Sequence, residues 1–213
     1  MKWYYHNFDP AEKKDWTPGG DRTRKITFPD GMQKWTSPKF DPAKAGWKIG
    51  HAPFGQFEGK LQTTGTSDKY TGCTNPICRC SDPMKTLWDR EVLMVKGKFT
   101  FPPVKDGHSY RILFGGVSHV GVGNGPTVYI NGKSVANGRG RIRRGQGGRP
   151  RGALISPAMA KEFSGQEVEL AAIGHLNMHH RTRKMHGFLT VWMEEMKNPP
   201  VNDELAWKGL PQI

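Results

Sequence analysis

Hydrophobic and polar residues alternate in several stretches of the second half of the chain. The alternation is partial over residues 86–101, which predicts one or two strands, and residues 109–120 and 126–132 are rich in β-branched and aromatic side chains. Residues 166–176 and 187–196 alternate well enough to predict two long strands. The core positions expected in these last two strands are Val168, Leu170, Phe188 and Val191.

Turn signals separate these stretches. Turn-forming residues such as those of TPGGD, FPDG and TSPKFDPAKAG interrupt the first 80 residues, so only short strands fit there. Asn131 and Gly132 predict a tight turn because both tolerate a positive φ. Ser156 as N-cap and Pro157 at the first helical position predict a helix of two turns. We therefore expect an all-β protein with long loops and one short helix.

Composition points to one core. The chain has 213 residues, of which 35% are hydrophobic, and its 27 glycines and 16 prolines are spread along its length rather than gathered into one block. We expect the main domain at 35–197, an N-terminal extension packed on it at 1–34, and a C-terminal tail or linker at 198–213. No run of 18 apolar residues exists, so we expect no membrane insertion, and the N-terminus lacks the apolar region of a secretory signal.

The charge is strongly positive and unevenly distributed. Lys and Arg number 32 against 19 Asp and Glu, a net charge of +13, and residues 107–161 hold nine basic side chains and no acidic one. Such an excess indicates an anionic partner. The stretch 138–152, GRGRIRRGQGGRPRG, combines Arg forks, which pair bidentately with carboxylate, sulfate or phosphate, with glycines that let backbone N–H groups approach the same anion. The alternative is a solvated loop whose charge only raises solubility.

A second basic group, HHRTRKMH at 179–186, lies between the last two predicted strands. In a sandwich of two sheets it would form a loop beside the arginine-rich one, and the two would make a groove. Its histidines, with an ordinary pKa of about 6.5, would add positive charge at acidic pH. The anion-binding residues that we predict from both groups are Arg139, Arg141, Arg143, Arg144, Arg149, Arg151, His179, His180, Arg181, Arg183 and Lys184.

The cysteines Cys73, Cys78 and Cys80 lie within eight residues. Their spacing is not that of a zinc ribbon or a c-type haem site, and no fourth cysteine completes a tetrahedral thiolate site. In an oxidising compartment Cys73 would pair with Cys78 or Cys80 and leave one free thiol, whereas in the cytosol all three would stay reduced. We favour the disulfide. We expect no metal at the histidines and no cofactor, and leave a structural calcium ion open.

Catalytic signals are absent from the sequence. Asp89, Glu91 and Asp106 are available carboxylates, but no nucleophile elbow, phosphate loop or zinc-protease motif surrounds them. We therefore expect no enzyme activity from this chain alone. Among the tryptophans, Trp47 and Trp88 are expected in the core. Those considered as exposed platforms for a sugar ring are Trp3, Trp16 and Trp207.

Four stretches, in their order, resemble the galactose-binding-like jelly-roll domains that accompany glycoside hydrolases and other polysaccharide-degrading enzymes. They are FDPAKAGWKIGHAPFG at 40–55, LWDREVLMVKGKFTFP at 87–102, TVYINGK at 127–133 and SPAMAKEFSGQEVELAAIGH at 156–175. The resemblance covers residues 35–195 and implies a jelly-roll β-sandwich that binds carbohydrate without catalysis. The basic insertion at 136–154 and the cysteine cluster depart from the pattern, which leaves the sugar open.

The leading hypothesis is a carbohydrate-binding module that holds an acidic, sulfated or uronate polysaccharide through its basic loops. The resemblance also implies neighbouring domains of a larger extracellular or periplasmic protein. A nucleic-acid-binding protein that uses the Gly/Arg loop is the first alternative, since such a stretch suits a phosphate backbone. The others are a hydrolase or lyase active on uronic acids, and a module that packs against an acidic surface of a partner domain.

Overall fold

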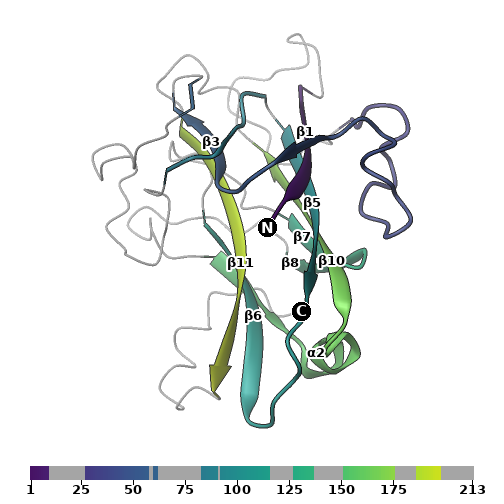
Figure 1. Cartoon of the computed structure of the whole chain (residues 1–213), viewed down its shortest axis with the longest axis vertical. Coiled ribbons are helices and arrows are strands. Elements are labelled where there is room, and N and C mark those ends of the chain that lie inside the picture. The colour runs from purple at the N-terminus through teal and green to yellow at the C-terminus, as the bar shows by residue number, and fades with distance from the viewer. Residues whose placement is uncertain are drawn as a thin grey trace.

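The computed structural model of the chain describes residues 1–9, 27–57, 60–61, 83–90, 92–115, 127–136, 151–175 and 186–197. Their strands form two sheets that face each other (Figure 1). The larger sheet has the order β2-β1-β5-β10-β7-β8 and the smaller one the order β4-β3-β11-β6-β9. The strands of the six-stranded sheet are β1 (Trp3–Phe8), β2 (Lys48–Gly50), β5 (Val92–Thr100), β7 (Thr127–Ile130), β8 (Lys133–Ala136) and β10 (Glu167–His175). Those of the five-stranded sheet are β3 (Phe54–Phe57), β4 (Thr86–Leu87), β6 (His108–Gly115), β9 (Arg151–Ile155) and β11 (His186–Lys197).

The expected all-β class is confirmed in these residues, and so are the local signals. The stretch 86–101 forms β4 and β5, and the two long predicted strands are β10 and β11. Asn131 and Gly132 turn the chain between β7 and β8 with φ of 48° and 79°. Helix α2 (Pro157–Phe163) begins after Ser156, whose hydroxyl accepts a hydrogen bond of 3.3 Å from the Met159 amide. The predicted domain boundaries stay a prediction, although β1 lies inside the sheet, between β2 and β5.

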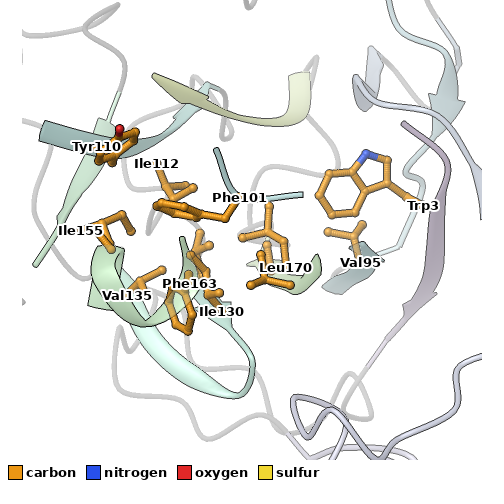
Figure 2. Close-up of a cluster of buried hydrophobic side chains, with 14 of the residues drawn as sticks. Trp3, Val95, Phe101, Tyr110, Ile112, Ile130, Val135, Ile155, Phe163 and Leu170 are labelled. Carbon is orange, nitrogen blue, oxygen red and sulfur yellow. The ribbon is translucent and has the colours of Figure 1, made fainter. Parts of the chain in front are cut away.

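The main core fills the space between the two sheets (Figure 2). Val95 of β5 and Leu170 of β10 contribute from one sheet, and Tyr110 and Ile112 of β6 from the other. Phe163 of α2 and Phe101 close the core, with their ring centroids 5.9 Å apart. Val168 and Leu170 are buried as expected. The side chains of Phe188 and Val191 lie outside what the structure describes.

A second core covers the other face of the six-stranded sheet, which we call the outer face. Val92 and Met94 of β5 and Ala171 of β10 point to it, because side chains alternate along a strand. The cover is the segment 27–47, drawn in dark blue in Figure 1, whose Trp35 and Trp47 pack there with ring centroids 6.2 Å apart. The first part of β5 is thus buried on both faces, which explains the unbroken apolar run at 92–95.

The described tryptophans that the sequence analysis discussed are all buried in one of the two cores. Trp47 and Trp88 are buried, as expected. The interpretation of Trp3 as an exposed platform is wrong: its side chain is 3% exposed, because the odd-numbered residues of β1 face the main core (Figure 2). Trp16 and Trp207 lie outside the described residues. Among the described residues, no helix is long and apolar enough to cross a membrane.

Candidate functional site

The predicted anion-binding residues and the three cysteines lie outside the described residues, with Arg151 as the exception. Arg151 is the first residue of β9, and its backbone is paired with Phe114 of β6. The structure does, however, describe the residues on either side of both basic segments. Ala136 and Arg151 flank the segment 137–150, and His175 and His186 flank the segment 176–185.

Strand directions place these four flanking residues at one end of the two sheets. Helix α2 joins the end of β9 to the start of β10, so the start of β9 and the end of β10 lie at the opposite end (Figure 1). Both β8 and β10 are antiparallel to β7 and therefore end together, while β9 and β11 are antiparallel to β6 and therefore begin together. We call this the loop end, defined by Ala136, Arg151, His175 and His186.

The two segments that leave from the loop end are strongly basic. They hold eight of the chain's Lys and Arg residues and no Asp or Glu, and Arg151 brings the basic total to nine. They contain no Phe, Tyr or Trp. Elsewhere, several exposed cations of the described residues are neutralised by ion pairs, at 3.0 Å for Arg90 with Asp9 and 2.7 Å for Lys105 with Glu195. The two segments therefore carry eight of the chain's 13 net positive charges.

Of the carboxylates considered for catalysis, the two that the structure describes, Asp89 and Asp106, are not brought together. Asp89 lies just before β5, at the loop end, and accepts a hydrogen bond of 2.9 Å from the Asn7 side chain. Asp106 precedes β6 at the opposite end, where its carbonyl lies 2.9 Å from His108 Nδ1. Glu91 lies outside the described residues. In the part of the chain that the structure describes, no group of three His, Cys, Asp or Glu side chains could hold a metal ion.

Sequence reasoning missed a buried ion pair on the outer face. Lys96 of β5 is 1% exposed, and its Nζ lies 2.8 Å from Oε1 of Glu169 on β10. The same ammonium donates to the carbonyls of Ser37 and Phe40, at 2.9 and 3.4 Å. The sequence does show Lys96 directly after an apolar run. Only the position of the segment 27–47 shows that the ammonium group of this lysine is covered.

Other titratable groups on this face respond to the same burial. Burial lowers the pKa of His6, and the positive charge of Lys48 lowers it further. The His6 ring stacks on Trp47, with centroids 6.0 Å apart. Burial raises the pKa of Tyr129, which meets Trp35 edge to face. These groups belong to the packing of the outer core rather than to an exposed site.

No protein-family model matches the chain, and no curated protein matches it. Solved structures similar to it include a β-glucuronidase from glycoside hydrolase family 2, at 14% identity and a TM-score of 0.38 over 81% of this chain and 13% of that one. A glycoside hydrolase family 2 member from Bacteroides cellulosilyticus DSM 14838 has 14% identity and a TM-score of 0.40, over 89% of this chain and 20% of that one. A β-glycosidase from Bacteroides vulgatus has 14% identity and a TM-score of 0.38, over 89% and 19%. The chain spans a fifth or less of these proteins, and similarity at this level assigns it no substrate or reaction.

Proposed function

We propose that this chain is a non-catalytic carbohydrate-binding module, a jelly-roll β-sandwich that holds an acidic polysaccharide at its loop end. The observation that carries the proposal is topological. Two segments with eight basic and no acidic side chains, far apart in sequence, are flanked by residues at the same end of the two sheets. Two sheets around one core, and the order of motifs that resembles galactose-binding-like domains, support the sandwich.

The chemistry suits sulfate and carboxylate groups. A guanidinium offers a planar fork of donors that matches either anion bidentately, and a charge-assisted hydrogen bond is about twice as strong as a neutral one. The spacing of arginines and glycines in residues 138–152 lets successive forks follow a repeating anionic chain. Contacts of this kind are exposed, so binding weakens as salt is added.

A polysaccharide suits the loop end better than a nucleic acid does. Single-stranded nucleic acids are gripped by stacking bases on aromatic rings, and neither basic segment contains one. Recognition of duplex DNA commonly places a helix in the major groove. The described helix α2 has seven residues and lies at the end of the sheets opposite the loop end (Figure 1).

The role that follows is tethering. Within a larger extracellular polysaccharide-degrading protein, the module would hold substrate near a catalytic domain and raise its effective concentration there. No residue of the chain then needs to act on the sugar. Asp89 and Asp106, at opposite ends of the sheets, offer no paired acid and base.

Calorimetric titration of the full chain tests the proposal. The panel is a sulfated polysaccharide, a polyuronate, a neutral glucan and single-stranded DNA, each at low and moderate salt. We expect one acidic glycan to bind at both salt concentrations. The double substitution Arg143→Ala/Arg183→Ala should weaken this binding at least about tenfold, because a hydrogen bond to a charged group contributes about 1.5–3 kcal/mol.

Lys161→Ala is the control, since this exposed lysine lies on α2 at the opposite end. It should leave the affinity unchanged. Preferential binding of the DNA would favour the nucleic-acid alternative. Equal binding to every polyanion that disappears at moderate salt would reduce the loop end to an unspecific charged surface.

A further inference from the structure

A cavity of about 700 Å³ lies on the outer face of the six-stranded sheet, and none of its lining residues belongs to the loop end. Its volume is within the range of ligand pockets, about 300–1,000 Å³. One wall is the segment 38–42, part of the cover of the outer face. The floor comes from three adjacent strands, with Tyr4 of β1, Lys96 and Lys98 of β5, and Glu169 of β10.

The wall of the cavity is fixed to its floor. Lys96 lies opposite Tyr4 in the sheet, and its ammonium binds Glu169 on the next strand. The two carbonyls that it also holds, those of Ser37 and Phe40, belong to the cover, and the Phe40 ring centroid lies 5.2 Å from Nζ. The cavity is therefore formed before any ligand arrives, which reduces the cost of ordering on binding.

The acidic side chains of the lining are engaged within the protein. Glu169 is paired with Lys96, and Oδ1 of Asp41 accepts hydrogen bonds from the amides of Ala43 and Lys44 at 2.9 and 3.2 Å. The exposed Lys98 also has a partner, because its Nζ lies 2.9 Å from Glu167 on β10.

Two cations of the lining remain without a counter-charge. Lys2 and Lys39 are exposed and form no ion pair with any described residue. Of the two lining carboxylates, Glu169 is paired with Lys96 and Asp41 has only amide donors, so an entering anionic group would meet one carboxylate charge against the two ammonium groups of Lys2 and Lys39. The electrostatics of the cavity thus favour an acid over a neutral ligand.

The rest of the lining is largely apolar. The rings of Tyr4 and Phe40 contribute to it, as do Pro38 and Pro42. An inorganic anion has no apolar surface, so contact with these side chains would add no hydrophobic free energy to its binding. A ligand with an apolar face would be stabilised, because that face and the cavity lining both lose contact with water. The cavity therefore suits a ligand that has both an apolar face and an anionic group.

We propose that this cavity binds a uronic acid unit of a glycan. The C–H face of the pyranose ring would pack on Tyr4 and Phe40, and the carboxylate would lie between Lys2 and Lys39. This site lies on the outer face of the six-stranded sheet and is separate from the loop end. The apolar and cationic character of its lining does not depend on the proposed function. The choice of a sugar acid over another organic acid rests on that function.

Titration of the ¹⁵N-labelled full chain with glucuronate, followed by NMR, tests this site. We expect the amides of Gly97 and Lys39, both in the lining, to shift in a saturable way. Lys2→Ala/Lys39→Ala should weaken glucuronate binding at least about fivefold, the order expected for two charge-assisted contacts at an exposed rim. Lys34→Ala/Lys44→Ala is the matched control, because it removes the same charge from exposed positions of the cover outside the lining.

The outcomes separate this site from the loop end. Arg143→Ala/Arg183→Ala should leave the glucuronate shift at Gly97 intact, even where it abolishes polysaccharide binding. Glucose that binds as tightly as glucuronate would overturn the role of the two lysines, and benzoate that binds equally would overturn the sugar. Absence of shifts at Gly97 and Lys39, with polysaccharide binding intact, would refute the cavity site and leave the proposed function standing.

Discussion

The two faces of the six-stranded sheet carry alternate residues of the same strands, yet they are buried in different ways. The inner face meets a second sheet, and the residues that form its core are hydrophobic (Figure 2). The outer face meets the segment 27–47, which forms no strand. On this face the buried side chains include Lys96, which is paired with Glu169.

The inner face is therefore the part of the molecule that specifies the fold, and the outer face is the part where a ligand could bind. Two sheets can interdigitate side chains along their whole length, so the space between them is filled. An irregular cover touches the sheet through anchors such as Trp35 and Trp47, and the cavity lies beyond them, under Pro38 and Phe40. Function on this face would therefore depend on how the cover is held.

Two neighbouring residues on β5 allow the packing of the two faces to be compared directly. Leu93 faces the inner core and Met94 the outer one, and both are fully buried. We expect Leu93→Ala to lower the free energy of unfolding by about 4 kcal/mol and Met94→Ala by about 2 kcal/mol, because the irregular cover can collapse onto the space left behind. Urea denaturation measures both. Equal losses would show that the cover is as rigid as the second sheet.

The buried ion pair gives the next largest effect. Lys96→Met should cost about 3 kcal/mol, since it leaves the carboxylate of Glu169 without its partner in a largely buried place. Adding Glu169→Leu should recover much of this loss, because an apolar pair of similar volume often replaces a buried ion pair without cost. Chemical denaturation of the two single variants and the double variant tests the coupling. Simply additive losses would contradict it.

A smaller effect is expected where the β7–β8 turn meets the cover. Gly132 has a φ of 79°, and a Cβ there would lie 3.3 Å from the Thr36 carbonyl oxygen, so Gly132→Ala adds crowding to backbone strain. The control is Gly165→Ala, with a φ of 69° and nothing within 4 Å of the added carbon. We expect about 1 kcal/mol of destabilisation for Gly165→Ala, from backbone strain, and about 2 kcal/mol for Gly132→Ala. Thermal unfolding compares them, and the same loss for both would show that the turn does not press on the cover.

Several elements were predictable because their signals are local. The Asn131–Gly132 turn needs two residues that tolerate a positive φ, and the start of α2 needs the hydroxyl of Ser156 and the ring of Pro157. The alternation of hydrophobic and polar residues predicted β10, because successive side chains of a strand point to opposite faces of the sheet. For the candidate site, the two basic groups are visible in the sequence, since charge is a property of composition.

Local signals in the amino-acid sequence are therefore enough to predict the all-β class, the order of most strands in the second half, and the sign of the charge. The burial of Trp3, the cover over Lys96 and the position of the flanks of both basic segments at one end follow only from the folded chain. These facts depend on which segment lies against which face of the sheet. Such contacts join residues far apart in the chain, and no local pattern encodes the partner.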